Sequence, residues 1–317
     1  MHYRRLGRTD IRVSAIGFGT WGIGGVTPGQ ASYGPTNDAD SLAALSLALE
    51  HGITFYDTAD IYGHGHSEEL LAQAFATKRH QVVIAGKVGY VDNFQRQDFS
   101  PRHIRESLDA SLARLRTDYL DVYQLHNPPV ESGAALEEMV DTLRALEHEG
   151  KIRSVGVSLR SPEDGVRVIE SGVDAIQVNF NLMDQRARTL GLLDAARTRR
   201  TGVIVRTPLA SGFLSGPLDT ATLDPRDHRR ARSAEQLRCW HRGAALFAAL
   251  NDDAGRTPVQ LALQFCLADA SVSTVVPGMM RRREVDENVG TFAATGMTDA
   301  ERHAIQGLYA GHEFFVR

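Results

Sequence analysis

The sequence has few cysteines, no long hydrophobic run and no excess of positive charge. Its 317 residues include only Cys239 and Cys266, which are far apart and match no metal-ligand spacing. The N-terminus lacks an apolar signal core, and no stretch reaches about 18 consecutive apolar residues. We therefore expect a cytoplasmic protein without a membrane partner. The formal net charge of −4 gives no reason to expect nucleic acid as a partner.

A dinucleotide-binding fingerprint of the Rossmann type is also missing. The glycine-rich stretch "GFGTWGIGG" (17–25) looks similar to one. It leads into the loop "VTPGQASYGPTND" and not into a helix, whereas the fingerprint must open a helix directly after a strand. We therefore reject this interpretation of the glycines.

Short apolar runs alternate along the chain with longer stretches of helical spacing. The predicted strands are 13–20, 53–57, 82–87, 120–126, 152–158, 175–180, 202–209 and 273–278. The predicted helices are 39–52, one capped by Ser67, 100–115, 134–148, one starting at Ser161, 186–199, 234–250, 258–268, 281–292 and 298–309. Uninterrupted apolar strands are typical of parallel sheets that are buried on both faces.

Eight strand–helix units predict an α/β fold, a closed (β/α)8 TIM barrel formed by a single domain over 1–317. An open doubly wound sheet is the competing architecture. The opening "YRRLGRTDIRVS" predicts an N-terminal β-hairpin that covers one end of the barrel, and extra C-terminal helices follow the last strand.

Polar side chains end several of the predicted strands. Asp57, Lys87 and His126 end three successive apolar runs, where each would be costly to bury without a partner. In a parallel barrel such strand ends meet at one face, which holds the active site. We expect an ion pair between Asp57 and Lys87, with Tyr62 close by, so that the ammonium lowers the pKa of the phenol.

This arrangement predicts acid–base chemistry on a carbonyl. Tyr62 would donate a proton to the carbonyl oxygen, and His126 would hydrogen-bond the same oxygen. Side chains cannot supply a hydride, so the scheme requires a nicotinamide or similar cofactor. A lyase or isomerase that uses Lys87 as a Schiff base is an alternative, which the carboxylate of Asp57 disfavours because it would hold the amine protonated.

An ordered set of motifs resembles the markers of the aldo-keto reductase family over nearly the whole chain. The motifs are "GFGTWG", "YDTADIYGHGHSE", "AGK", "YLDVYQLHNP", "GVS", "IQVNFN", "RTPLASGFLSG" and "VVPG…VDEN". The resemblance implies the same barrel and an NADP(H)-dependent oxidoreductase that reduces an aldehyde, ketone or sugar to an alcohol. It assigns the catalytic roles to Asp57, Tyr62, Lys87 and His126. A non-catalytic, cofactor-binding regulatory subunit of the same fold is the alternative.

The resemblance also implies a dinucleotide that lies extended across the barrel mouth. Its contacts would be Gly19, Thr20, Trp21, Asp57, Ser158, Gln177, Arg206, Thr207, Pro208, Leu209, Ser211, Gly212, Leu214, Gly278, Met280, Glu284, Glu287 and Asn288. Ser158 and Gln177 would bind the carboxamide, and the irregular segment 215–233 would fold over the cofactor. Trp21, Tyr62, Tyr90 and His126, with the loop 88–94 and Phe314 or Phe315, would surround a small-molecule carbonyl substrate.

Several positions depart from the commoner family pattern. Leu159 replaces an asparagine, and Arg206 replaces an aromatic residue that stacks on nicotinamide. The charge of Arg206 would disfavour the oxidised, cationic ring and so favour reduction. Gly278, Met280 and Glu284 stand where relatives have basic residues, and the neighbouring arginines 281–283 could replace them toward a 2′-phosphate. We expect NADPH, with NADH as the alternative; the oligomeric state and the substrate are not predicted.

Overall fold

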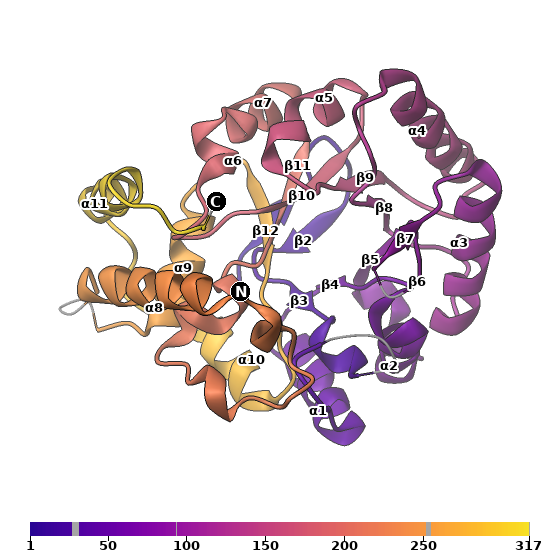
Figure 1. Cartoon of the computed structure of the whole chain (residues 1–317). Helices are drawn as coiled ribbons and strands as arrows, with labels where there is room; N and C mark the ends of the chain where they lie inside the picture. Colours follow the sequence, from indigo (N-terminus) through magenta and orange to yellow (C-terminus); the bar gives the residue numbers. More distant parts are fainter. Residues whose placement is uncertain (27–31, 93, 252–254, 317) are drawn as a thin grey trace.

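The computed structural model describes residues 1–26, 32–92, 94–251 and 255–316. Its centre is an eight-stranded parallel sheet in the order β12-β11-β10-β9-β8-β5-β4-β3, which curls into a barrel (Figure 1). The strands are β3 (Phe18–Gly19), β4 (Phe55–Asp57), β5 (Val83–Val88), β8 (Val122–His126), β9 (Val155–Ser158), β10 (Ala175–Asn179), β11 (Gly202–Arg206) and β12 (Val272–Val276). Parallel bridges from Ile16 to Val275 and from Gly19 to Gly278 join the two edges, so the predicted barrel is confirmed.

The predicted N-terminal hairpin is present and closes the end of the barrel at which the strands begin. It pairs β1 (Tyr3–Arg5) with β2 (Arg12–Ser14), antiparallel. Leu6, Ile11 and Val13 from this hairpin are buried and pack on side chains of the barrel strands. Gly7 is required at its turn, because a Cβ there would lie 2.3 Å from the backbone nitrogen of Gly202.

The first predicted strand, 13–20, is wrong as a single element. Its beginning belongs to β2 of the hairpin and its end to β3 of the barrel. Between them, the N–H of Ala15 bonds to the carbonyl of His2 and the N–H of Gly17 to that of Val275. The chain therefore changes partner within one continuous apolar run, and periodicity carries no signal for such a change.

Helices cover the outside of the barrel (Figure 1). They are α1 (Asp38–Glu50), α2 (His66–Phe75), α3 (Pro101–Leu115), α4 (Gly133–His148), α5 (Gly165–Glu170), α6 (Arg186–Thr189), α7 (Leu192–Arg199), α8 (Ala234–Ala249), α9 (Pro258–Leu267), α10 (Arg282–Val289) and α11 (Asp299–Ala310). None of them, within the described ranges, is long and apolar enough to cross a membrane.

Three predicted helix boundaries are wrong. The helix predicted over 186–199 is interrupted at Gly191, whose φ of +75° belongs to the left-handed region. The helix predicted over 281–292 ends at Val289 and continues as a 3-10 turn. Ser67 does not cap α2, because Gly65 holds the N-cap position; the Ser67 hydroxyl is buried and donates to Thr20 Oγ1 at 2.6 Å.

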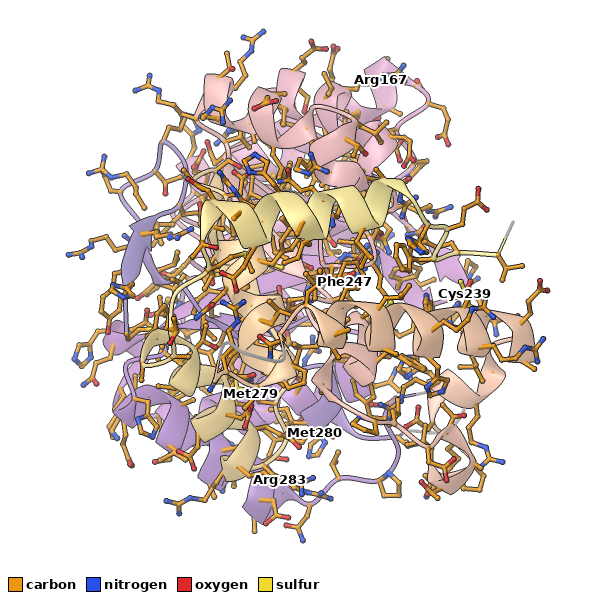
Figure 2. All side chains as sticks on the ribbon, turned by 90° about the vertical axis from the view of Figure 1, so that its left-hand side faces the viewer. Arg167, Cys239, Phe247, Met279, Met280 and Arg283 are labelled. Atoms are coloured by element: carbon orange, nitrogen blue, oxygen red, sulfur yellow. The ribbon has the colours of Figure 1, made fainter. Side chains whose placement is uncertain are left out.

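The C-terminal tail packs on α8 and α11 instead of the barrel mouth. Figure 2 shows α11 alongside α8, with Phe247 between them. The Phe314 ring is buried, 5.4 Å from the ring of Phe247 and 5.9 Å from that of Tyr309. Phe315 lies 6.2 Å from Trp240. Phe314 is therefore occupied in the packing between α8 and α11, whereas the contribution of Phe315 to the substrate site stays a prediction.

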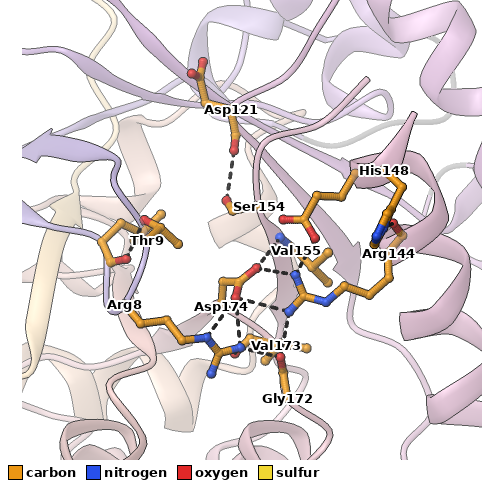
Figure 3. Close-up of polar contacts among 12 residues, drawn as sticks. Arg8, Thr9, Asp121, Arg144, His148, Ser154, Val155, Gly172, Val173 and Asp174 are labelled. Carbon is orange, nitrogen blue, oxygen red and sulfur yellow. Dashed lines mark hydrogen bonds and ion pairs between the residues drawn. The ribbon is translucent and has the colours of Figure 1, made fainter. Parts of the chain in front are cut away.

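Two aspartates at the starts of strands are enclosed by arginines. Asp174, directly before β10, accepts bonds from Arg8 at 2.9 Å, from Arg144 at 2.7 Å and from the N–H of Val155 at 3.0 Å (Figure 3). These bonds connect the hairpin, α4 and β9 at one point.

Asp121, directly before β8, has an equivalent set of donors. It accepts from Arg79 at 2.9 Å, from Arg153 at 2.8 Å and from the N–H of Ile84 at 3.0 Å. We call these two networks, Asp174 with Arg8 and Arg144, and Asp121 with Arg79 and Arg153, the base networks.

Candidate active site

Asp57, Lys87 and Tyr62 meet where β4 and β5 end. Lys87 Nζ donates to Asp57 Oδ2 at 2.7 Å, to the carbonyl of Thr58 at 2.8 Å and to the Tyr62 hydroxyl at 3.1 Å. The Lys87 side chain is fully buried, and these bonds use all three ammonium protons. The predicted ion pair is therefore present, with the phenol attached to it.

The second carboxylate oxygen of Asp57 accepts bonds from two glutamines. Gln177 Nε2 lies 2.6 Å and Gln124 Nε2 lies 3.4 Å from Asp57 Oδ1. Ser158 Oγ in turn donates to Gln177 Oε1 at 3.3 Å. The two residues predicted to bind a carboxamide thus lie together beside the ion pair. Gln124 was not predicted, although its position two residues before His126 places both side chains on one face of β8.

His126 lies among aromatic side chains. Its ring centroid is 6.1 Å from that of Tyr62, 5.0 Å from Tyr90 and 6.0 Å from Phe94, all nearly perpendicular. Burial, together with the positive charges of Lys87 and Arg206, holds the pKa of His126 well below its usual value. The imidazole is therefore neutral at physiological pH, and its buried Nδ1 has no partner among the described residues.

The predicted lowering of the Tyr62 pKa is wrong for this structure. Burial raises the pKa of Tyr62 and Lys87 opposes it, but the negative charge of Asp57 weakens that opposition. Burial alone would lower the pKa of Lys87, yet Asp57 and Tyr62 hold it above its usual value. The site therefore contains a protonated phenol that accepts a hydrogen bond from an ammonium.

A second hairpin, absent from the sequence prediction, forms one wall of this site. It pairs β6 (Tyr90–Asp92) with β7 (Arg96–Gln97). Gln97 Nε2 donates to the carbonyls of His126 at 2.9 Å and Asn127 at 3.1 Å, and Asn127 Nδ2 donates to the Tyr90 hydroxyl at 3.1 Å. Tyr90 and Phe94 of the predicted 88–94 loop therefore face His126, whereas Asn93 lies outside the described residues.

The irregular segment 215–233 crosses between two loops of the barrel mouth. Trp21, Tyr33 and His228 pack edge to face, with ring centroids 4.7 to 5.0 Å apart. Arg229 makes a two-pronged ion pair with Asp227 and donates to the carbonyl of Ser211 at 3.1 Å. The segment thus joins the loop after β3 to the loop after β11, which contains much of the predicted cofactor site.

The loop after β11 has an unusual backbone. Thr207, Ala210 and Ser211 have φ of +53°, +46° and +57°, and Gly212 has +92°. Non-glycine residues in this region cluster at functional sites, and left-handed turns can point successive N–H groups at an anion. Pro208 and Leu214 are buried beside this turn, and Leu209 is half-buried.

Arg206 precedes that turn and is incompletely paired. Its Nη2 donates to the carbonyl of Leu159 at 2.7 Å, while its buried Nε has no partner within the described part of the chain. Burial lowers the pKa of Arg206, and the nearby Tyr62 and Asp57 partly offset this. The side chain therefore stands at the site with an unused donor.

The last group of predicted cofactor residues surrounds the start of α10. Gly278 pairs with Gly19, and Met280 packs against Gly22. The carboxylate of Glu284 accepts from the N–H groups of Met280 at 2.6 Å and Arg281 at 3.2 Å, so it caps the helix. Glu287 accepts from the hydroxyl of Thr257, Asn288 is buried, and the arginines 281–283 are exposed.

Taken together, the barrel mouth combines a protonated phenol, a buried ammonium, a neutral imidazole and a loop with an unusual left-handed backbone. A TIM barrel with these groups at the carboxyl ends of its strands is suited to nicotinamide-dependent oxidation and reduction.

Comparison with known proteins gives the same class. The model of the aldo/keto reductase family matches residues 15–310. An uncharacterized oxidoreductase, YqkF of Bacillus subtilis, is 30% identical over 98% of this chain and 99% of its own. Aldo-keto reductase yakc of Schizosaccharomyces pombe, whose name specifies NADP(+), is 31% identical over 91% and 86%. The solved holo form of aldo-keto reductase AKR11C1 from Bacillus halodurans superposes with a TM-score of 0.79, at 28% identity over 100% and 98%.

The chain therefore belongs to the aldo/keto reductase family. It is an NAD(P)H-dependent oxidoreductase that acts on carbonyl groups.

Proposed function

We propose that the protein reduces a small-molecule aldehyde, ketone or sugar to an alcohol with NADPH, and that Tyr62 donates the proton. The observation that carries this proposal is the 3.1 Å hydrogen bond from Lys87 Nζ to the Tyr62 hydroxyl. It connects the phenol to an ammonium that Asp57 holds in its charged form.

The residues at the mouth fit a nicotinamide dinucleotide. Arg206 Nε, His126 Nδ1 and Trp21 Nε1 are buried donors or acceptors without partners among the described residues, as expected for groups that await a ligand. The turn 210–212, with its left-handed backbone, lies where the family resemblance places the pyrophosphate. The nicotinamide, when bound, supplies the hydride to the carbonyl carbon.

The protein side chains handle the proton. The neutral His126 donates a hydrogen bond to the substrate oxygen and orients the carbonyl toward Tyr62. Because the pKa of Tyr62 is raised, the phenol is protonated and can transfer its proton to the oxygen as negative charge develops there. The phenolate that remains is stabilised by the Lys87 ammonium, and alcohol oxidation runs the same steps in reverse.

The proposed preference for NADPH rests on the start of α10. Three exposed arginines, 281–283, lie there and could bind a 2′-phosphate. Glu284, which would oppose that phosphate, is engaged with two backbone N–H groups of the cap. Fluorescence titration should give a lower Kd for NADPH than for NADH, and R281A/R282A/R283A should weaken NADPH binding only. Equal affinities in the unmodified protein would contradict the preference.

Arg206 supports reduction as the direction. Its guanidinium has an unused donor among the described residues. By the resemblance to the family, it takes the place of an aromatic residue that stacks on the nicotinamide. A fixed positive charge there would disfavour the cationic, oxidised ring. We therefore expect Arg206→Leu to lower the ratio of the Kd for NADP⁺ to the Kd for NADPH.

The test of the proton donor is NADPH oxidation with 4-nitrobenzaldehyde. Tyr62→Phe should lower kcat/KM by roughly 10²–10⁴-fold, the usual contribution of a general acid, while NADPH still binds. Tyr119→Phe, far from the site at the opposite end of the barrel, is the matched control and should change little. Turnover retained by Tyr62→Phe would refute the assigned role. NADPH binding without turnover of any carbonyl by the unmodified protein would favour the regulatory subunit.

A further inference from the structure

A second set of buried charged groups lies behind the loop that carries Tyr62. Asp60 is two residues before Tyr62, and Glu68 is on α2 with no exposed surface. Arg114 of α3 donates from Nε to Glu68 Oε2 at 2.6 Å. The other carboxylate oxygens, Asp60 Oδ1 and Glu68 Oε1, are buried and have no partner among the residues that the structure describes.

The charges of this cluster do not balance if both carboxyl groups are ionised. The charged and titratable groups that face Asp60 are Glu68, Arg114, Lys87 and the buried phenol of Tyr123, and the backbone N–H of Ile61 donates to its carboxylate. The charge of Lys87 is already compensated by Asp57, which leaves one guanidinium for the buried carboxylate of Glu68 and the half-buried one of Asp60. A largely desolvated carboxylate without a counter-charge of its own is expected to neutralise by taking up a proton.

Asp60 is the member of the pair that is expected to hold this proton. Glu68 is bonded directly to Arg114, whereas Asp60 forms no ion pair among the described residues. Burial and the negative charge of Glu68 raise the pKa of Asp60 to about 7. The geometry and the electrostatics therefore agree that the carboxyl of Asp60 is largely protonated below neutral pH.

The cluster contacts the turn that fixes Tyr62. Gly65 has a φ of +95°, and a Cβ there would lie 2.4 Å from Cδ of Arg114, so the guanidinium stem packs directly against the backbone after Tyr62. On the other side of Asp60, the carbonyl of Thr58 accepts from Lys87. Asp60 and Arg114 therefore lie next to the backbone that holds the phenol against the ammonium.

We propose that Asp60 is a positioning residue that must be protonated for the Tyr62 loop to keep its catalytic geometry, so that its ionisation lowers the rate of carbonyl reduction. An ionised Asp60 would repel Glu68 in a region of low dielectric constant and be attracted toward Lys87 or Arg114. Either movement disturbs the contact between Lys87 and Tyr62. The effect on rate rests on the proposed function, whereas the protonation of Asp60 does not.

The first experiment tests whether the carboxyl of Asp60 is protonated near neutral pH, and it does not depend on enzyme activity. Carbon-13 NMR of aspartate-labelled, NADPH-bound protein, with the Asp60 resonance assigned by its loss in Asp60→Asn, should show a titration near neutral pH. A midpoint close to the ordinary aspartate pKa of about 3.9 would overturn the proposal. This result stands even if no carbonyl substrate is reduced, which would refute the proposed function alone.

The rate is tested through the pH profile of kcat/KM with 4-nitrobenzaldehyde. The unmodified enzyme should lose activity as pH rises through the Asp60 pKa. Asp60→Asn resembles the protonated carboxyl in shape and charge and should abolish this decline. Glu68→Gln removes the like charge and should shift the decline to lower pH, even if Asp60→Asn folds poorly.

Asp194→Asn, on the exposed surface of α7, is the matched control and should leave the profile unchanged. A merely structural role of the cluster would lower activity at every pH without moving the decline. A profile of Asp60→Asn that coincides with that of the unmodified enzyme would overturn the proposal.

Discussion

The two ends of the barrel differ in the groups that bind their buried carboxylates. At the end where the strands begin, Asp121 and Asp174 are each held by two arginines and a backbone N–H. At the end where the strands finish, Asp57 is held by a lysine and two amides. Arginine does not lose its proton at accessible pH, so the arginines of the base networks stay charged, whereas the lysine that contacts Asp57 can lose its proton.

The degree of hydrogen-bond satisfaction differs in the same direction. The carboxylate oxygens of both Asp121 and Asp174 accept hydrogen bonds. Burial by itself would raise the pKa of Asp174, but the hydrogen bonds from Arg144 and from the N–H of Val155 outweigh this effect and lower it. Around Asp57, buried atoms of His126 and Arg206 have no partner among the described residues. In a TIM barrel the face where strands begin carries stability and the opposite face carries chemistry, and the aspartates at the two ends follow that division.

The largest expected effect comes from changing the carboxylate at the catalytic end. Asp57→Asn removes the charge that keeps Lys87 protonated, so burial should lower the pKa of Lys87 and weaken its stabilisation of the phenolate. We expect kcat/KM for 4-nitrobenzaldehyde to fall by roughly 10²–10⁴-fold. A loss of less than tenfold would mean that the ion pair is structural, as at the opposite end.

The same change in a base network should affect stability and spare activity. Asp174→Asn removes the carboxylate of Arg8 and one of the two that Arg144 contacts, the other being Glu147, and both arginines are about one third exposed, so water compensates in part. We expect the free energy of unfolding to fall by about 2 kcal/mol, below the cost of breaking a fully buried pair. Urea denaturation measures this, and kcat should stay within about twofold. Asp194→Asn, an exposed carboxylate, serves as control.

The pH dependence of stability sharpens the comparison further. The folded-state pKa of Asp174 is lowered, so its contribution to stability is present above the unfolded pKa of about 3.9 and is lost as pH falls through the folded pKa. The unmodified protein should therefore lose stability below about pH 4 more steeply than Asp174→Asn. Parallel acid-denaturation curves for the two proteins would show that the network does not act through this charge.

The barrel and the residues of its catalytic end could be predicted from the sequence more completely than the rest of the fold. Asp57, Lys87 and His126 could be predicted to meet because parallel strands end at one face and each side chain ends an apolar run. The contact of Gln177 with Asp57 and the raised pKa of Tyr62 depend on burial and on distances between separate strands, which periodicity does not encode.

Predictions that depend on local sequence patterns alone are wrong at several places in the fold. The apolar run 13–20 changes partner without any break in composition, and the hairpin β6–β7 has no strong turn signal. Ser67 is predicted as a helix cap because serine favours that position, but its buried hydroxyl donates a hydrogen bond to Thr20 Oγ1 instead. Local preference was overridden in these places by tertiary contacts.

The smallest expected effect concerns an arginine–aspartate pair that resembles those of the base networks but lies at the catalytic end of the barrel. Arg229 and Asp227 form two parallel bonds and attach the irregular segment to the carbonyl of Ser211. Because this pair fixes a segment over the predicted cofactor site, Arg229→Ala should weaken NADPH binding by about tenfold, roughly 1.4 kcal/mol, chiefly through faster release. Stopped-flow fluorescence measures the release rate, and Arg226→Ala, in the same segment but exposed, is the matched control. If Arg229→Ala instead lowers the stability of the free protein and leaves release unchanged, the pair behaves as the base networks do, and the division between the two ends does not extend to this segment.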